Sequence, residues 1–355
     1  MTKLKPYIPN KLPLKNLDLT KLIPLISKAN IELGRYDGCL KAVPNPDILL
    51  SPMTTQEAVL SSKIEGTQAS LTDVLEYDAG LENKANAMDI KEVLNYRNAV
   101  FSAVNSLKKR PLSLNLILNI HHMLLENVRG SKVLIGNFRK TQNWIGVAGC
   151  KQEDAKYIPP KPEDLMQYIY NFVEYLNKPE MEEQDIIVQT AIMHAQFELL
   201  HPFIDGNGRV GRLLIPLFLY AKKLISIPMF YISGYFERNR QEYYECLNVI
   251  SMENNWSKWV NFFLNSVIEQ SKINTKKVED ILILYKEMKE KIPNIINTKY
   301  TVNILDTVFT VPVFSSRKFL SISKIPAPTV KVILRKLVQA KILKLTEKAI
   351  SRKPA

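Results

Sequence analysis

Apolar residues recur at helical spacing along most of this chain. The clearest run covers residues 185–200, which contain no Gly or Pro and are followed within two positions by Pro202. A second apolar run covers residues 209–223. The pattern predicts a mainly α-helical protein in which a short loop joins these two helices.

A third helix is predicted over residues 54–65, in the N-terminal part. Thr54 or Thr55 can cap its first turn, and Gly66 can end it because glycine readily adopts the left-handed conformation of a helix C-terminus. A helix that ends in Glu-Gly is common, so this segment alone indicates only structure.

Residues 137–160 interrupt the helical pattern. Glycines and two successive prolines bracket two short β-rich runs, residues 144–147 and 156–158. Two such runs joined by a glycine-containing loop predict a β-hairpin. An ordinary surface hairpin and a hairpin that borders a binding site both fit the pattern.

The C-terminal part begins with a long polar helix, predicted over residues 266–292. Three short helices and a strand are predicted after it, at residues 301–309, 313–320, 328–340 and 342–345. Ser315 or Ser316 can open the second of these helices. Three short helices followed by a strand are similar to a winged helix, whose third helix is the recognition element.

Positive charge is concentrated in the same region. The chain carries a formal +13, and residues 299–355 contain twelve Lys and Arg against two Asp and Glu, so the first 298 residues carry only +3. Lys331, Arg335 and Lys336 are expected on the outer face of the third helix. A DNA contact through residues 299–355 and a protein-docking or dimerisation module both fit this charge.

The remaining composition excludes several classes of protein. Three widely spaced cysteines argue against a disulfide framework and suit a reducing cytoplasm. No Cys/His cluster has zinc spacing, and His121, His122 and His194 are expected to be packed or solvated. Neither a signal peptide nor a membrane-spanning run is evident, so we expect a cytoplasmic location without membrane contact.

The loop between the two central helices carries most of the candidate chemistry. Its amides stand at the start of a helix, where unpaired N–H groups and the helix dipole favour an anion. Gly206 and Gly208 let an anion approach the backbone, and Asn207 can donate a side-chain hydrogen bond to it. Arg209 and Arg212 are three positions apart and suit two phosphates in series.

Two further groups in the loop can take part in a reaction. Asp205 offers a hard oxygen ligand beside the phosphates, as Mg²⁺ requires. His201 titrates near neutral pH, and its neutral imidazole can take a proton from an attacking hydroxyl. The loop therefore predicts a polyphosphate site that activates a hydroxyl.

Other interpretations fit parts of the loop. Gly206, Gly208 and Gly211 match the dinucleotide-binding pattern G-x-G-x-x-G, but that pattern needs a preceding strand and an acidic residue about 20 positions later. Here a helix precedes, and residues 225–231 contain no acid. A glycine-rich turn with a solvated arginine pair would explain Gly-Asn-Gly, but not the His, Asp and second Arg at fixed offsets.

Residues 201–212 resemble the HPFx(D/E)GNGRxxR signature of the Fic family without a departure. The resemblance implies a helical enzyme that transfers AMP from ATP to a Tyr, Thr or Ser hydroxyl of a protein and releases pyrophosphate. It implies that His201 is the general base and that Asp205 binds Mg²⁺. The implied ATP-binding residues are Gly206, Asn207, Gly208, Arg209 and Arg212.

The resemblance extends upstream to an inhibitory motif, (S/T)xxxE(G/N), which Ser61, Glu65 and Gly66 match. In that subclass the glutamate pairs with the second arginine of the signature, here Arg212, and so occupies the guanidinium that the γ-phosphate needs. The resemblance covers roughly residues 10–275 and implies autoinhibition.

Two contact regions are expected beside this site. The hairpin resembles the family's flap over the active site, whose edge could pair with an extended target segment. The flap residues are Trp144, Ile145, Gly146 and Val147. Tyr244 and Leu247 share a face of a predicted helix and are candidates for adenine or ribose contacts, although such spacing is also common in cores.

The expected fold is mainly α, with a helical Fic core, a short β-hairpin flap, an N-terminal helical extension and a small C-terminal winged-helix-like domain. The expected parts are an extension with the inhibitory motif at residues 1–100, a catalytic domain at 101–275, a connecting helix at 276–298 and the winged-helix-like domain at 299–355.

The function expected first is an autoinhibited protein adenylyltransferase that uses ATP and Mg²⁺. The target protein is not evident, although the chain itself is a candidate, and a homodimer is a candidate assembly. Two alternatives remain open: a DNA-binding regulator whose loop senses nucleotide, and an enzyme that removes AMP from a modified protein with Glu65 orienting a water.

Overall fold

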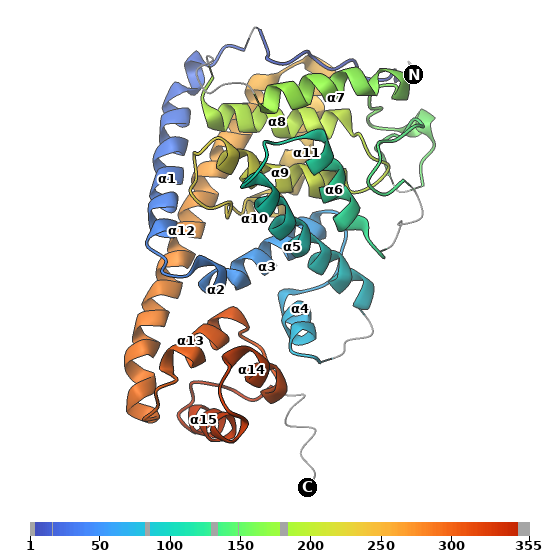
Figure 1. The fold of residues 1–355 in the computed structure, drawn as a ribbon. Coiled ribbons are helices and arrows are strands. Elements are labelled where there is room, and N and C mark those ends of the chain that lie inside the picture. Colours follow the sequence, from blue (N-terminus) through green and yellow to red (C-terminus); the bar gives the residue numbers. More distant parts are fainter. Residues whose placement is uncertain are drawn as a thin grey trace.

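The computed structural model describes residues 4–15, 17–81, 86–128, 134–147, 149–177 and 184–346. Over these residues the chain is mainly α-helical, as predicted (Figure 1). Its helices are η1 (Thr20–Leu22), α1 (Ile23–Lys41), α2 (Pro46–Leu49), α3 (Ser51–Ile64), α4 (Leu71–Asp78), α5 (Ala87–Leu107), α6 (Leu114–Leu125), η2 (Gln152–Asp154), α7 (Pro162–Leu176), α8 (Ile186–Leu200), α9 (Asn207–Ala221), α10 (Ser233–Arg238), α11 (Arg240–Glu253), α12 (Trp256–Ile295), α13 (Thr301–Thr310), α14 (Ser316–Ser323) and α15 (Ala327–Gln339).

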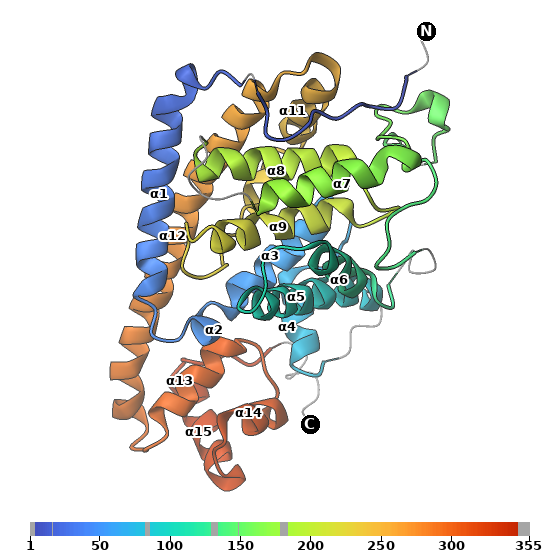
Figure 2. The same cartoon turned by 45° about the horizontal axis from the view of Figure 1, so that its top comes forward.

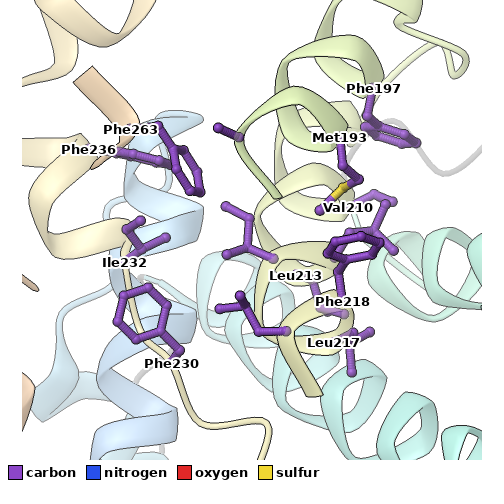
Figure 3. Close-up of a cluster of buried hydrophobic side chains, with 14 of the residues drawn as sticks. Met193, Phe197, Val210, Leu213, Leu217, Phe218, Phe230, Ile232, Phe236 and Phe263 are labelled. Atoms are coloured by element: carbon purple, nitrogen blue, oxygen red, sulfur yellow. The ribbon is translucent and has the colours of Figure 1, made fainter. Parts of the chain in front are cut away.

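The centre of the larger core is formed by α8 and α9. Side chains on every side of α8 are buried, which is the pattern of a helix enclosed by other helices. Asp185 caps its start by accepting hydrogen bonds from the backbone N–H groups of Ile187 and Val188. Figure 3 shows Met193 and Phe197 beside side chains of α9, and Phe230, Ile232, Phe236 and Phe263 facing them from the opposite side. The loop between α8 and α9 thus stands on a rigid base.

One edge of the molecule is formed by α1 and α12, which lie side by side (Figures 1 and 2). α12 begins ten residues before the predicted polar helix, because its first turns are not polar. There Trp256, Trp259 and Phe263 are buried in the main core. The helix then continues past the core and leads into α13.

The helix α3 carries the predicted inhibitory motif and packs between α5, α9 and α10. It begins at Ser51, so the predicted caps Thr54 and Thr55 are wrong. Pro52 explains the earlier start, since proline is preorganised for the first turn of a helix. The prediction for the other end is confirmed: α3 ends next to Glu65, and Gly66 has a φ of +100°.

The β-hairpin predicted within residues 137–160 is not formed as strands in the described residues. Instead a single antiparallel bridge joins Ile145 and Tyr157. The backbone N–H of Ile145 donates to the carbonyl of Tyr157 at 2.9 Å, and the N–H of Lys156 donates to the carbonyl of Ile145 at 2.8 Å. The two runs are too short to extend this pairing into a ladder.

The C-terminal module, residues 301–346, contains α13, α14 and α15 and shares a small hydrophobic core with the end of α12. Its three helices were predicted, although α14 begins at Ser316, three residues later than expected, with Ser315 as its cap. The strand predicted at residues 342–345 is not present in the part of the chain that the structure describes, so a wing is not confirmed. A strand needs a paired neighbour to satisfy its backbone groups, and no described segment supplies one.

Two of the three predicted domain boundaries fall within helices, and the third, at residue 298, lies between α12 and α13. α5 runs across the expected boundary at residue 100, and α12 runs across the one at residue 275.

No helix in the described ranges has the length and apolar character that a membrane span requires.

Candidate active site

The loop between α8 and α9 has the backbone conformations that a tight reversal needs. His201 follows the last residue of α8 in the left-handed region, with a φ of +43°. Gly206 also has a positive φ, +79°, which glycine adopts at little cost. α9 then begins at Asn207, two residues before the predicted start. The loop therefore presents the first turn of α9, with its free N–H groups, beside His201.

Asn207 was expected to face an anion, but its side chain closes the loop instead. Its Oδ1 accepts a hydrogen bond from the backbone N–H of Phe203 at 2.8 Å, and its Nδ2 donates to the carbonyl of Phe203 at 2.9 Å. The side chain is buried, so these bonds satisfy it where water cannot. Asn207 sets the shape of the loop, and its backbone N–H remains at the helix start.

His121 on α6 packs against the loop between α8 and α9. Its ring stacks on Phe203 with 3.7 Å between ring centroids, and its Nδ1 accepts a hydrogen bond from the backbone N–H of Gly136 at 2.9 Å. The hydrogen is therefore on Nε2, which donates to the carbonyl of Asp205 at 3.0 Å. Burial lowers the pKa of His121 to about 4, so this neutral form persists at pH 7. His121 is packed, as expected.

Arg139 joins the predicted flap region to the loop, and the sequence analysis missed it. Its side chain is buried and donates to backbone carbonyls: Nε to His201 at 2.9 Å and Nη2 to Pro160 at 2.6 Å. Burial lowers the pKa of Arg139 to about 10, which still leaves it charged. Asn143 adds a hydrogen bond from its Nδ2 to the carbonyl of Phe203 at 3.0 Å. No signal in the sequence distinguished Arg139 from the other charged residues of segment 137–160.

His201 is held in the form that can accept a proton. Its Nδ1 lies 3.2 Å from the carbonyl oxygen of Glu198, which can only accept, so Nδ1 carries the hydrogen. The lone pair is then on Nε2. Burial lowers the pKa of His201 to about 4, so the ring is neutral at physiological pH. A neutral, oriented imidazole is what a general base requires.

Arg212 is buried and is held by the end of α3, the segment that carries the predicted inhibitory motif. Its Nη2 lies 2.5 Å from Oε1 of Glu65, and its Nε and Nη2 donate to the hydroxyl and the carbonyl of Ser61 at 3.0 and 2.9 Å. Burial alone would raise the pKa of Glu65, but the charge of Arg212 outweighs it and lowers that pKa. The same pair raises the pKa of Arg212 against the effect of its burial. Both groups are therefore charged.

The Glu65 carboxylate also lies against the first turn of α9. A Cβ atom placed on Gly208 would overlap Oε1 of Glu65 and come within 2.9 Å of Nη1 of Arg212. Gly208 has no positive φ, so it is not needed there for a left-handed turn. What it provides is room for an anionic oxygen near the helix N-terminus, and Glu65 fills that room.

Arg209 is held by a second carboxylate, which the sequence did not reveal. Its Nη1 lies 3.2 Å from Oε2 of Glu92 on α5, and the same oxygen accepts a hydrogen bond from the hydroxyl of Thr67 at 2.8 Å. The Arg209 side chain is 4% exposed, and its Nε has no partner in the described part of the chain. The two arginines of the loop are thus engaged by two different helices.

Asp205 is the exposed acid of the loop. Its side chain is 56% exposed, and its Oδ1 accepts a hydrogen bond from the backbone N–H of Gly206 at 2.6 Å. The described residues contain no cluster of three His, Cys, Asp or Glu that could hold a metal without further ligands. A single accessible carboxylate beside a helix N-terminus that suits phosphate fits Mg²⁺, which is commonly shared between one or two carboxylates and substrate phosphates.

Two other carboxyl groups near Arg212 are buried. Glu57 on α3 accepts hydrogen bonds from the hydroxyl and N–H of Ser233 at 2.6 and 3.3 Å and so ties α3 to α10. Burial raises the pKa of Glu57 to about 7 and that of Glu198 to about 8. Glu198 is therefore mainly protonated at pH 7, and its oxygen lies against Gly211, where a Cβ would overlap it.

Most of the predicted contact residues are exposed. Trp144 and Ile145 are each 40% exposed and Val147 is 70% exposed. Tyr244 is 44% exposed, with the guanidinium of Arg240 5.9 Å from its ring centre. Burial and then the charge of Glu65 raise the pKa of Tyr244. Leu247 is half-buried against the main core.

Comparison with known proteins identifies two regions of the chain. Residues 23–105 match the Fic/DOC family N-terminal region, and residues 111–219 match the Fic/DOC family. The protein adenylyltransferase fic-1 of Caenorhabditis briggsae is 31% identical over 143 residues, which are 40% of this chain and 24% of that protein. The protein adenylyltransferase Fic of Drosophila grimshawi is 26% identical over 220 residues, or 61% of this chain and 38% of that protein. The chain therefore matches less than half the length of these relatives.

Solved structures show the same fold. A Fic family protein from Desulfovibrio desulfuricans matches with a TM-score of 0.61 and 18% identity, over 99% of this chain and 97% of that chain. A Fic domain-containing signaling protein from Bacteroides thetaiotaomicron matches with a TM-score of 0.55 and 18% identity, over 71% of this chain and 98% of that one. With the two matched regions and the complete signature loop, this chain is a Fic/DOC family protein, related to protein adenylyltransferases.

Proposed function

We propose that this protein is an autoinhibited protein adenylyltransferase that transfers AMP from ATP to a Tyr, Thr or Ser hydroxyl of a protein. The observation that carries the proposal is the position of the Glu65 carboxylate, which pairs with Arg212 and lies against the first turn of α9. An anionic oxygen is stable in that position, and a phosphate is the ligand that such a helix start and guanidinium favour.

The reaction follows from the groups around the loop. Nε2 of His201 takes the proton of the acceptor hydroxyl as its oxygen attacks the α-phosphorus of ATP. A new P–O bond forms to the acceptor, the bond from the α-phosphorus to the bridging oxygen breaks, and pyrophosphate leaves with the electron pair. Positioning and charge neutralisation supply most of the rate in reactions of this type.

The phosphates would be held by the loop and the first turn of α9. The backbone N–H groups of Asn207 and Gly208 would face the anion, and Arg209 and Arg212 would neutralise the β- and γ-phosphates. The N–H of Gly206, expected to face the anion as well, donates to Oδ1 of Asp205 in this structure. Asp205 would hold Mg²⁺, which supplies charge neutralisation on the phosphate oxygens when bound. The Asn207 side chain keeps its bonds to Phe203 and maintains the loop.

Autoinhibition follows from competition for one guanidinium. While Glu65 and Ser61 hold Arg212, that side chain is not free for the γ-phosphate, and ATP lacks a productive position. Gly66 ends α3 at this point and brings Glu65 to the loop. Removal of the Glu65 carboxylate is therefore expected to activate transfer.

The remaining candidate residues would contact the nucleoside of ATP and the target protein. Tyr244, on the same face of α11 as Leu247, is 44% exposed, and its ring suits stacking on the adenine or packing against the ribose. An extended target segment could add main-chain hydrogen bonds beside the backbone bridge between Ile145 and Tyr157. The flap residues at this bridge are Trp144, Ile145, Gly146 and Val147. The protein itself is the first target to test, and a homodimer the first assembly.

The test uses purified protein, Mg²⁺ and ATP labelled at the α-phosphate. Wild type, Glu65→Gly and Glu65→Gly/His201→Ala are compared for label on the protein itself. Label that rises in the single variant and is lost in the double variant supports AMP transfer, the inhibitory role of Glu65 and the role of His201 as base. ATP labelled at the γ-phosphate serves as the control, because AMP transfer leaves no γ-label on the protein.

Removal of AMP from a modified protein is the alternative that the same site allows, with Glu65 orienting a water. The Glu65 variant separates the two activities. Transfer increases when Glu65 is removed, whereas removal of AMP is lost. Incubating a labelled, modified substrate with wild type and with Glu65→Gly therefore decides between them.

A further inference from the structure

The C-terminal module has an unusual charge, because Asp306 is its only acid and α14, α15 and the turns around them carry cations alone. Between residues 311 and 346 the chain has eight Lys and Arg and no Asp or Glu. None of these eight cations has an ion-pair partner in the described structure, and most of them are exposed. A surface of one sign attracts a polyanion over distances of about 10 Å at moderate salt.

Most of these cations lie on α14, on α15 and in the turn between them, so the arrangement of the two helices determines where the charge is presented. α14 ends at Ser323, and a three-residue turn leads directly into α15. Lys324 in this turn has a φ of +57°, and Ile325 is buried against the module core. A turn of this length between two short helices is typical of the helix-turn-helix, a motif whose second helix enters the major groove when it binds DNA.

The two faces of α15 are clearly divided. Val330, Ile333 and Leu337 are buried and anchor the helix to the module core. The opposite face is exposed, and its residues are Lys331, Val332, Arg335, Lys336 and Gln339. It offers three cations for phosphates, a side-chain amide for base edges and an apolar contact for a thymine methyl group.

The first helix of the pair contributes cations at its own start. Ser315 caps α14 by accepting a hydrogen bond from the N–H of Lys318 at 3.3 Å, and Arg317 and Lys318 occupy the first turn. Asn303 of α13 donates to the carbonyl of Ser323 at 3.0 Å and fixes the end of α14 against α13. The orientation of α14 relative to the rest of the module is therefore set before any ligand binds.

We propose that the C-terminal module binds duplex DNA, with α15 in the major groove and the first turn of α14 on the phosphate backbone. B-form DNA fits because its major groove admits an α-helix, whereas that of an RNA duplex is too deep and narrow. This activity is separate from AMP transfer, since none of the residues that carry it belongs to the loop between α8 and α9.

The test measures binding of the full-length protein to a fluorescent duplex of about 30 base pairs, by anisotropy over a series of salt concentrations. Lys331→Gln/Arg335→Gln/Lys336→Gln is compared with Lys108→Gln/Lys109→Gln/Arg110→Gln, at the exposed end of α5. Both variants remove two Lys and one Arg, so their net charges are equal. Thermal unfolding checks that each variant is folded, and Arg317→Gln/Lys318→Gln provides an independent change on α14.

The expected result is that the α15 variant binds at least about tenfold more weakly and that its plot of log affinity against log salt is less steep by about 3, because three phosphate contacts are lost. The α5 variant keeps nearly the wild-type affinity and slope. A duplex RNA of the same sequence binds more weakly than the DNA.

Two outcomes would overturn the proposal. Equal weakening in the α15 and α5 variants would mean that net charge alone attracts DNA. No binding to duplex DNA at low salt, together with α15-dependent binding to poly-glutamate, would identify the module as a docking surface for an acidic protein.

Discussion

Glu92 holds Arg209 much as Glu65 holds Arg212, although the two carboxylates come from different helices. Oε2 of Glu92 lies 3.2 Å from Nη1 of Arg209 and also accepts a hydrogen bond from Thr67, two residues after Glu65. Asp89, which lies on α5 like Glu92, accepts a hydrogen bond from the backbone N–H of Gln68 at 2.8 Å. α5 therefore fixes the turn that brings Glu65 to the loop.

Glu92→Gln is expected to raise AMP transfer, but less than Glu65→Gly. It weakens the hold on both Arg209 and Thr67 while leaving the Glu65–Arg212 pair in place. Thr67→Val removes only the hydroxyl that bonds to Glu92 and should give a still smaller rise. Initial rates of labelling from α-labelled ATP measure the order, and a Glu92→Gln rate at or below wild type would contradict it.

Glu65→Gly should make the protein less stable without nucleotide and more responsive to nucleotide. The free energy of unfolding of the ligand-free variant falls by about 1–3 kcal/mol, because Arg212 is left buried without its anion. Bound ATP restores that contact and adds its binding energy. The increase in Tm on adding Mg²⁺ and ATP should therefore be larger in the variant than in wild type. Glu65→Gln, which keeps the side-chain size, is the matched control.

The pH profile of transfer should show an acidic limb far below the ordinary histidine range. Burial lowers the pKa of His201 to about 4, and Glu65 opposes that shift, so the pKa in Glu65→Gly is expected to be at or below about 4. The base is then neutral throughout pH 6–8, and kcat/KM should not fall as pH decreases from 8 to 6 through loss of this base. A limb centred near 6.5 would show that His201 is solvated during catalysis.

The stability of the protein should decrease as the pH falls from about 6.5 toward 4. His121, His194 and His201 have pKa values lowered to about 4, 3 and 4 by burial, so the unfolded chain binds protons in this range that the folded chain does not. Glu57 and Glu198 act in the opposite direction, because their raised pKa values make the folded chain bind protons up to about pH 7 or 8. Urea unfolding of His194→Phe and wild type isolates one histidine: the variant should lose less stability between pH 6.5 and 4.

Arg139→Ala is expected to lower both stability and transfer. The substitution leaves the buried carbonyls of His201 and Pro160 without their donor, at a cost of about 3 kcal/mol. Arg139→Lys keeps the positive charge, but its single ammonium group cannot donate to both carbonyls. We therefore expect losses of stability and transfer that are intermediate between wild type and Arg139→Ala. Urea unfolding and labelling in the Glu65→Gly background measure the two effects. Full stability in Arg139→Ala would exclude this role.

The pattern of apolar residues by itself determined that the protein is helical, and it located α8 and α9 and the loop between them. This was possible because Pro202 and Gly206 act locally: they end one helix and permit the turn into the next. The loop residues that carry candidate chemistry were also evident, since their spacing within one turn brings them together whatever the rest of the chain does.

Only the tertiary structure decided which groups from distant segments meet these residues. Glu92, Arg139 and His121 are far from the loop in sequence, and their roles arise from the packing of α5, α6 and the segment before α7 against α8 and α9. Burial supplies the rest: it lowers the pKa of His201, and it turns the Asn207 side chain inward to satisfy the backbone of Phe203. Local sequence sets the conformation of a loop, but desolvation and long-range pairs are properties of the folded chain.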